Sequence, residues 1–251
     1  MVDDDRRVAL ITGGSRGIGR ACALALAGDG CDVAVNYRRD ADAARDTVRA
    51  VESLGRRALA CQASVESPEE DEAMVAAVTA ELGGIDVLVH SAGIASRGKT
   101  VADTDPDEVE RVLGVHALAA HHLARLVLPS MRSRPRGDVV FVSSVAARML
   151  AANGAPYNMG KAALEALALT LAKEERRHNI HVNVVAPGLV VTEMGRRLVR
   201  AMGVDDIGSL DAAAPFGHVC RPEDVAEVVR FLCSDAAGYL TGQVIAVDGG
   251  G

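Results

Sequence analysis

The chain has 251 residues, of which 49% are apolar and 2% aromatic, and its formal net charge is −7. These values suit one large α/β domain with a buried core better than two small domains or a disordered chain. The acidic balance, with arginines spread along the chain, argues against a nucleic-acid surface and therefore against DNA or RNA as a partner.

The first residues, MVDDDRRVALIT, run from acidic groups directly into an apolar strand. They lack the basic region, long apolar core and cleavage site of a signal peptide, and no stretch approaches a membrane span, so we expect no membrane partner. The five cysteines form no CxxC pair and no metal-ligand spacing. This cysteine usage is typical of a reducing compartment, and we expect a cytoplasmic protein.

Short apolar runs rich in β-branched residues alternate with longer amphipathic stretches along the chain. The alternation predicts a doubly wound parallel sheet with helices on both faces, and the apolar continuity of the runs predicts strands covered on both sides. The seven predicted strands are 8–12, 32–37, 57–61, 86–90, 138–144, 181–187 and 243–247. The predicted helices lie near 17–29, 41–54, 68–82, 107–133, 156–177 and 222–233.

The first predicted strand runs into TGGSRGIG, which opens the first predicted helix. Glycines let the backbone turn tightly and approach a diphosphate, which free N–H groups at a helix start can bind. The spacing Gly13, Gly17, Gly19 differs from the common G-x-G-x-x-G, because Cys22 stands where the last small residue would be. An ordinary strand-to-helix turn is the alternative, but the position after the first strand favours a dinucleotide site.

The second predicted strand ends in NYRR, with no carboxylate before Asp40. A carboxylate at this place would bind the adenosine ribose 2′-hydroxyl and repel a 2′-phosphate, whereas guanidinium groups bind a phosphate by paired hydrogen bonds. We therefore expect NADPH rather than NADH, with Arg38 and Arg16 as a phosphate clamp. The alternative is that these arginines are solvated surface charges.

The motif YNMGK places Tyr157 and Lys161 four residues apart, on one face of a predicted helix. An ammonium about 5 Å from a phenol, at an effective dielectric near 20, favours the phenolate by roughly 3 kcal/mol, or about 2 pKa units. We therefore expect a lowered pKa for Tyr157 and an acid that exchanges its proton near neutrality. A solvated helix pair is the alternative.

Residues 189–221 form the one irregular stretch, with several glycines, weak periodicity and a proline at 215. Ligands of an open α/β sheet bind beyond the carboxyl ends of its strands, so an insertion there suggests a substrate lid. A surface loop with a short helix is the alternative. Apart from this stretch we expect one catalytic domain over residues 1–251.

Five motifs occur in a characteristic order: TGGSRGIG, HSAG at 90–93, Ser144 with YNMGK, APG at 186–188, and the terminal YLTGQVIAVDGG. Together they resemble the short-chain dehydrogenase/reductase family, and within it the 3-oxoacyl-[acyl carrier protein] reductases. The resemblance covers essentially the whole chain. It implies a Rossmann-type fold, a nicotinamide cofactor, hydride transfer to a carbonyl, and a homotetramer.

The resemblance also implies residue roles. Ser144 would hydrogen-bond the substrate oxygen, Tyr157 would give it a proton, and Lys161 would bind the nicotinamide ribose and tune the tyrosine. No metal is expected. The implied cofactor-binding residues are Gly13, Ser15, Arg16, Gly17, Ile18, Gly19, Arg38, Ser64, Val65, Ser91, Ala92, Gly93, Pro187, Gly188, Val190 and Thr192.

Three motifs depart from the family pattern, at four positions. His116 stands where the family has an asparagine that holds a water of the proton relay; a histidine could hold that water or simply fill space, and it titrates near 6.5. Ser64 replaces an aspartate that bonds adenine, and a serine would bond it more weakly. His90 and Ser91 replace asparagines, a loss that we expect to loosen the strand packing beneath the loop.

These observations predict an NADPH-dependent reductase acting on a 3-oxoacyl thioester or a related small carbonyl compound. The alternatives are an NAD-dependent alcohol dehydrogenase acting on a sugar or sterol, and a noncatalytic nucleotide-binding sensor or scaffold. An acyl carrier protein remains a candidate partner, although Pro135 and His178 stand where carrier-dependent relatives have docking arginines. Arg97, Arg148 and Met194 are candidate substrate contacts.

Overall fold

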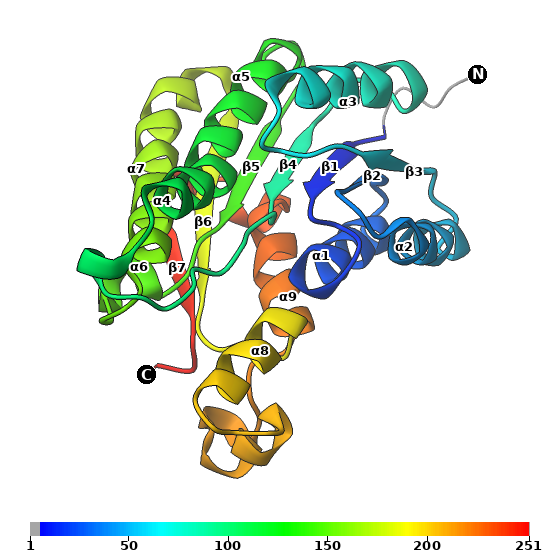
Figure 1. Cartoon of the computed structure of the whole chain (residues 1–251). Helices are drawn as coiled ribbons and strands as arrows, with labels where there is room; N and C mark the ends of the chain where they lie inside the picture. The colour runs from blue at the N-terminus through cyan, green and yellow to red at the C-terminus, as the bar shows by residue number, and fades with distance from the viewer. Residues whose placement is uncertain (1–5, 251) are drawn as a thin grey trace.

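The apolar runs of the sequence form seven strands, which the computed structural model, describing residues 6–250, joins into one parallel sheet (Figure 1). The strand order is β3-β2-β1-β4-β5-β6-β7, so the chain reverses its direction of winding between β1 and β4. The predicted seven-stranded, doubly wound fold is confirmed. The strands are β1 Val8–Thr12, β2 Asp32–Tyr37, β3 Ala58–Gln62, β4 Val87–His90, β5 Gly137–Val142, β6 Ile180–Pro187 and β7 Val244–Val247.

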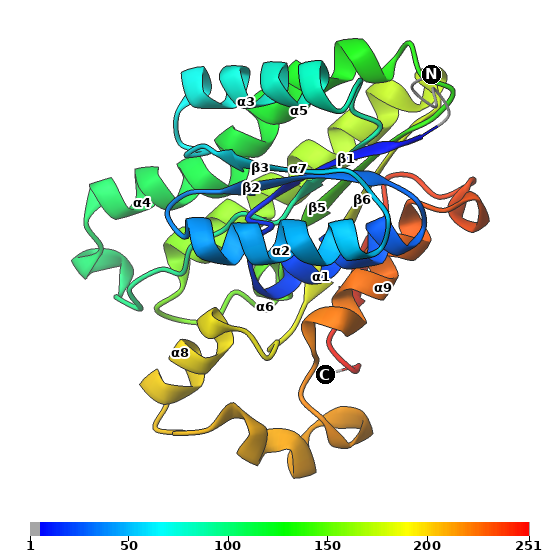
Figure 2. The same cartoon turned by 90° about the vertical axis from the view of Figure 1, so that its right-hand side faces the viewer.

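Helices cover both faces of this sheet. Figure 2 shows α1, α2 and α9 on one side and α3, α5 and α7 on the other. A π-helical turn over Gly114–Leu118 joins α4 to α5, so the single helix predicted for 107–133 is interrupted there. The helices are α1 Gly17–Gly28, α2 Ala41–Ser53, α3 Pro68–Glu81, α4 Pro106–Leu113, α5 Ala119–Met131, α6 Ala146–Met149, α7 Ala155–Glu175, α8 Glu193–Ala201 and α9 Pro222–Leu232.

Each face of the sheet has its own apolar core. On one face Leu10 and Phe141 pack with Leu123 of α5 and Leu164 of α7, and all four side chains are fully buried. A second cluster joins the opposite face of the strands to α1, α2 and α9. The edge strands β3 and β7 are only partly buried, so the expectation of strands covered on both sides holds for the five inner strands and is wrong for the two edges.

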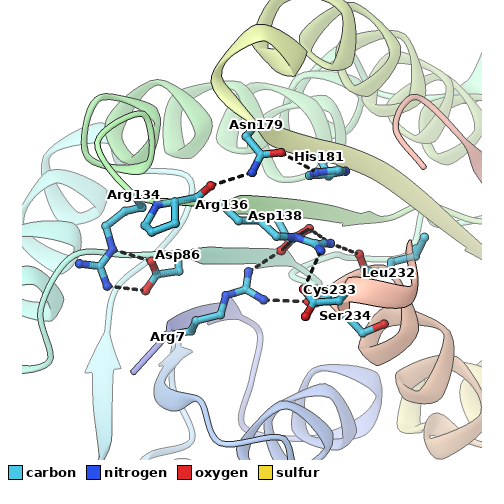
Figure 3. A network of polar contacts seen from close by, with 12 residues as sticks. Arg7, Asp86, Arg134, Arg136, Asp138, Asn179, His181, Leu232, Cys233 and Ser234 are labelled. Carbon is cyan, nitrogen blue, oxygen red and sulfur yellow. Dashed lines mark hydrogen bonds and ion pairs between the residues drawn. The ribbon is translucent and has the colours of Figure 1, made fainter. Parts of the chain in front are cut away.

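Buried ion pairs hold the amino ends of the strands (Figure 3). Asp32, Asp86 and Asp138 are at most 2% exposed. A buried carboxylate loses its hydration, so it needs a charged partner, and each of the three has at least one arginine. The pairs are Asp32 with Arg57, Asp86 with Arg134, and Asp138 with Arg136 and Arg7. These pairs fasten the edge of the sheet opposite to the carboxyl ends of the strands.

The continuous stretch Pro106–Met131 is, by length and composition, long and apolar enough to cross a membrane, which differs from the expectation that no segment approaches a span. Within that stretch, 56% of its apolar 18-residue window is buried in the fold. Its inward side chains, among them Leu123, Val127 and Met131, belong to the core beneath the sheet. A helix packed between neighbours is apolar over much of its surface for this reason.

Candidate active site

The end of β5 and the first half of α7 bring Ser144, Tyr157 and Lys161 together. Ser144 is the second residue after β5; its Oγ donates a hydrogen bond to the carbonyl of Pro187 at 3.3 Å and also interacts with the hydroxyl of Tyr157. Tyr157 and Lys161 leave α7 on the same face, with Lys161 Nζ 5.7 Å from the centroid of the tyrosine ring. The expected placement of an amino group against the phenol is therefore present.

Lys161 is buried, with 4% of its surface exposed, and its Nζ donates a hydrogen bond to the carbonyl of Val142 at 2.8 Å. Burial lowers the pKa of Lys161 to about 7, and the carboxylate of Glu165 opposes this change. The side chain therefore changes its charge near neutral pH.

The phenol of Tyr157 does not behave as expected from the spacing alone. Burial raises the pKa of Tyr157, and the hydrogen bond with Ser144 offsets only part of this increase. The predicted lowering of this pKa is therefore wrong. The phenolate would lose its hydration in this environment, and the neighbouring lysine is only partly charged at neutral pH, so desolvation exceeds attraction.

The imidazole of His116 lies behind the phenol in the π-helical turn. It is fully buried, and the ring Nε2 is 2.9 Å from the carbonyl oxygen of Ile94, which assigns the ring proton to Nε2. Nδ1 then carries the lone pair, and it has no hydrogen-bond partner among residues 6–250. Burial, aided by Lys161, lowers the pKa of His116 to about 2. The expected titration near 6.5 is therefore wrong, and the ring is neutral.

Two glycines make the space for this ring. A Cβ atom at Gly93 would lie 2.9 Å from Cε1 of His116, and one at Gly160 would lie 3.3 Å from its Cβ and Cδ2. The first distance is far inside van der Waals contact and the second is tight. The imidazole is thus held between the HSAG loop and α7.

His90, at one of the positions where looser packing was expected, is fully buried and hydrogen-bonded through both ring nitrogens. Its Nδ1 is 3.0 Å from Thr12 Oγ1, and its Nε2 is 3.1 Å from the carbonyl oxygen of Val115. Thr12 Oγ1 in turn accepts hydrogen bonds from the amides of Ser91 and Ala92. The side chain thus joins β1, β4 and the π-helical turn by hydrogen bonds of its own, and the expected loosening stays a prediction.

The glycine loop has the geometry of a phosphate cradle. Gly13 has a φ of +63°, and a Cβ atom at Gly19 would lie 2.3 Å from the carbonyl oxygen of Gly13. Helix α1 begins after Arg16 without a side-chain cap from the described residues, which leaves its first N–H groups available to an anion. These residues fit the diphosphate of a dinucleotide.

The two arginines of the predicted phosphate clamp form ion pairs with carboxylates. The sequence did not predict these pairs. Arg16 forms ion pairs with Asp40 and, at 2.8 Å, with Glu193 at the start of α8. Arg38 pairs with Glu66 at 2.8 Å. Both arginine side chains are about half exposed, so the alternative of surface charges is compatible with these pairs and the phosphate clamp stays a prediction.

The remaining implied cofactor residues fall into two groups. Ser64, Val65, Ser91, Ala92, Gly93, Pro187 and Gly188 lie at or just beyond the carboxyl ends of β3, β4 and β6, on the edge of the sheet that carries Tyr157. Ile18 and Val190 instead turn their side chains into the apolar core, and Ser15 is 8% exposed. Any contact of Ile18 or Val190 with a cofactor would therefore come from the backbone.

Residues 189–221 contain α8, a short helix of the kind that the surface-loop alternative allowed, and short 3₁₀ turns. Val199, Ile207 and Val219 form a separate small apolar cluster in this segment. Thr192 caps α8 by accepting a hydrogen bond from the amide of Gly195, and its methyl group lies against Gly17 of the glycine loop. The segment thus begins beside the phosphate cradle.

Comparisons with known proteins agree over nearly the whole chain. Residues 13–251 match the family described as enoyl-(acyl carrier protein) reductase. The chain is 34% identical over 242 residues to the 3-oxoacyl-[acyl-carrier-protein] reductase FabG of Staphylococcus epidermidis, covering 96% of this chain and 97% of that protein. It is also 34% identical over 251 residues to the L-rhamnose 1-dehydrogenase (NAD(P)(+)) of a Sphingomonas species, covering 97% and 95%.

A similar solved structure is the L-sorbose reductase of Gluconobacter frateurii complexed with NADPH and L-sorbose. The two share a TM-score of 0.90 and 32% sequence identity, over 97% of this chain and 95% of that one.

Proposed function

The chain belongs to the short-chain dehydrogenase/reductase family, and from that premise we propose that it reduces a ketone to a secondary alcohol with NADPH. Its family membership makes it an oxidoreductase with NAD(P)-dependent carbonyl and alcohol chemistry. The substrate class that we assign is a 3-oxoacyl thioester or a related carbonyl compound. The single observation that carries the proposed reduction of a ketone is the meeting of Ser144, Tyr157 and Lys161 beside the end of β5.

The bound nicotinamide supplies a hydride to the carbonyl carbon. The chain supplies the proton: Tyr157 gives its hydroxyl proton to the substrate oxygen while Ser144 donates a hydrogen bond to that oxygen. A raised pKa suits this direction, because a phenol that stays protonated is ready to act as an acid. Lys161, with a pKa of about 7, then supplies the proton that restores the hydroxyl of Tyr157.

In this proton path the ring of His116 acts as a hydrogen-bond acceptor. Its unpartnered Nδ1 and Lys161 Nζ both lie within 4 Å of the point where a Cβ of Gly93 would be. A water held between these two nitrogens would accept a hydrogen bond from Lys161 and donate one to Nδ1. This role needs a neutral ring, which the low pKa of His116 supplies.

Arg16 and Arg38 support the choice of NADPH, because a 2′-phosphate beside them would form charge-assisted hydrogen bonds. Their present partners, Asp40, Glu66 and Glu193, would have to yield to that phosphate. The same carboxylates favour a second candidate, use of NADH. Replacing Arg38→Asp and measuring both Michaelis constants tests the choice: an unchanged preference for NADPH would refute the clamp.

Large apolar side chains support an acyl or similarly apolar substrate. Met149 and Leu150 at the end of α6, Leu198 of α8 and Met202 just after α8 are more than half exposed. They belong to the segments that follow β5 and β6, beyond the strand ends where this fold binds ligands. Residues 189–221 would act as the lid over such a substrate within one catalytic domain. Arg97, Arg148 and Met194 stay candidate contacts.

A homotetramer is proposed from the family and from exposed apolar groups on the helical layer. Leu118, Met159 and Leu169 are 65%, 49% and 37% exposed. Docking of an acyl carrier protein is a secondary proposal, since Arg132 of the neighbouring surface is held by Glu175. Five free thiols support a cytoplasmic location. A mass measurement in solution tests the tetramer.

The purified protein, mixed with NADPH and a panel of ketones that includes 3-oxoacyl thioesters, tests the proposal directly. Steady oxidation of NADPH that requires the ketone is the expected result. Tight binding of nucleotide without turnover of any ketone would instead support the noncatalytic sensor.

A further inference from the structure

Three successive residues at the end of β5 are each bonded to one face of α7. The three partners lie one helical turn apart on α7, although not in the order of the strand residues, and each pair forms one rung between the strand end and the helix. These rungs fix the strand end against the helix. The pairs are Val142 with Lys161, Ser143 with Glu165, and Ser144 with Tyr157.

The rungs of Tyr157 and Lys161 contain the proposed catalytic groups, but the rung of Glu165 has no role in the proposed reaction. Its Oε1 accepts a hydrogen bond from Ser143 Oγ at 2.9 Å. Its Oε2 is 4.0 Å from Arg148 Nε, and the side chain is 13% exposed. A carboxylate this far withdrawn from water usually has a charged group to stabilise.

Lys161 is that charged group. It lies one helical turn before Glu165, at the spacing that brings side chains together. The other ionisable groups that face Lys161 are His90, His116 and Tyr157. Burial lowers the pKa of His90 to about 4 and that of His116 to about 2, and Tyr157 keeps its proton, so all three are neutral. Glu165 therefore supplies the negative charge on this side of the ammonium.

We propose that Glu165 is a positioning residue for the reaction: it anchors the strand residue before Ser144 to α7, and its carboxylate stabilises the ammonium of Lys161. The inference rests on the proposed function for its catalytic part. Its electrostatic part stands apart from any substrate. Arg148, whose Nε is 4.0 Å from Oε2 of Glu165, interacts with the same carboxylate from a more exposed side chain.

The chain contains only three lysines, Lys99, Lys161 and Lys173, and the other two are exposed. Selective ¹³C labelling of lysine Cε therefore gives three NMR signals whose titration can be followed in the whole protein. In Glu165→Gln, which keeps an acceptor for Ser143, the midpoint of the Lys161 signal should fall by about one pH unit. In Glu174→Gln, an equal change of charge further along α7, it should stay in place. An unmoved midpoint in Glu165→Gln would overturn the proposal.

The pH profile of kcat gives the second readout. The loss of activity on the alkaline side should move to lower pH in Glu165→Gln by the same amount as the NMR midpoint. Ser143→Ala keeps the carboxylate, so it should lower kcat while leaving the position of the profile unchanged. If Ser143→Ala moved the profile as far as Glu165→Gln, the charge would not be the cause and the proposal would fail. A wild-type protein that reduces no ketone would refute the proposed function, and the NMR titration would still decide the role of Glu165.

Discussion

The ring of His116 meets the ring of Tyr157 edge to face, with centroids 5.3 Å apart and planes inclined at 83°. This geometry is the preferred one for aromatic pairs and orients the phenol. It exists because Gly160, between Tyr157 and Lys161 on α7, leaves room for the imidazole. The size of residue 116 and the absence of a side chain at 160 are therefore coupled.

Gly160→Ala tests that coupling. Alanine in a helix interior normally stabilises by up to about 1 kcal/mol over glycine. Here its Cβ would lie 3.3 Å from His116, so we expect lower thermal stability and lower kcat. In a His116→Asn background the same replacement should recover stability. Thermal unfolding of the four proteins measures the interaction, which we expect to be about 1 to 3 kcal/mol; additive effects would show that the two positions are independent.

Tyr157→Phe removes the proposed proton donor and leaves the ring in place. We expect kcat to fall by at least about 10²-fold, while NADPH binding, followed by the fluorescence of the reduced cofactor, changes little. Tyr239→Phe provides the control, because that side chain is fully exposed. Retained turnover in Tyr157→Phe would reject the assignment of the acid.

Glu66→Gln frees Arg38 from a carboxylate that competes with a 2′-phosphate. Exposed ion pairs contribute at most about 1 kcal/mol, so the dissociation constant of NADPH should fall about threefold to fivefold. NADH lacks that phosphate, and its binding should be unchanged. Equal gains for both cofactors would mean that Glu66 acts on the adenosine and not on the clamp.

Asp71 on α3 is fully buried, and neither of its carboxylate oxygens has a hydrogen-bond partner among the described residues. Burial raises the pKa of Asp71 to about 7, with a smaller contribution from Glu70. Protonation therefore stabilises the fold: the contribution is complete below about pH 4 and is lost as the pH rises to 7. Urea unfolding should show Asp71→Asn more stable than wild type at pH 8, with a smaller difference at pH 5.

Asp42→Asn is the matched control for that measurement, since its side chain is 89% exposed. It should leave the pH dependence of unfolding as it is in the wild type. If Asp71→Asn did the same, the buried carboxylate would already be charged and stabilised in the fold.

Asp138→Asn breaks the buried pairs with Arg7 and Arg136. Removing one partner of a buried ion pair leaves the other charge uncompensated, so we expect a loss of about 3 kcal/mol of unfolding free energy. Asp235→Asn removes the fully exposed partner of the same Arg136, and it should leave the free energy of unfolding unchanged within error. NADPH binding should survive in both variants, because these residues lie at the amino ends of the strands; loss of binding in Asp138→Asn would contradict this.

Much of the fold could be predicted because its signal is local. Apolar, β-branched runs located the strands to within about two residues, and the alternation with amphipathic stretches determined the topology. Helix α6 has only four residues, and α8 lies in a segment with weak periodicity, so neither gave a clear pattern. The π-helical turn is invisible to a pattern search because it adds one residue to a continuous helix.

The positions of the site residues could be predicted, because they follow from sequence spacing. Their pKa values could not, because they depend on burial. Four-residue spacing placed Lys161 against Tyr157, but the pKa of the phenol depends on burial, which spacing does not report. The carboxylates beside Arg16 and Arg38 come from distant segments. One missed signal was present: a glycine at position 160 inside a helix is costly and usually marks close packing, here against His116.

Residues 189–221 carry a small apolar cluster of their own, formed around Val199, Ile207 and Val219. Because that cluster is separate from the two cores of the sheet, changes within the segment need not disturb the framework that holds the proton donor. New substrate preferences could thus evolve, or be engineered, by exchanging this one module while the reaction chemistry stays constant.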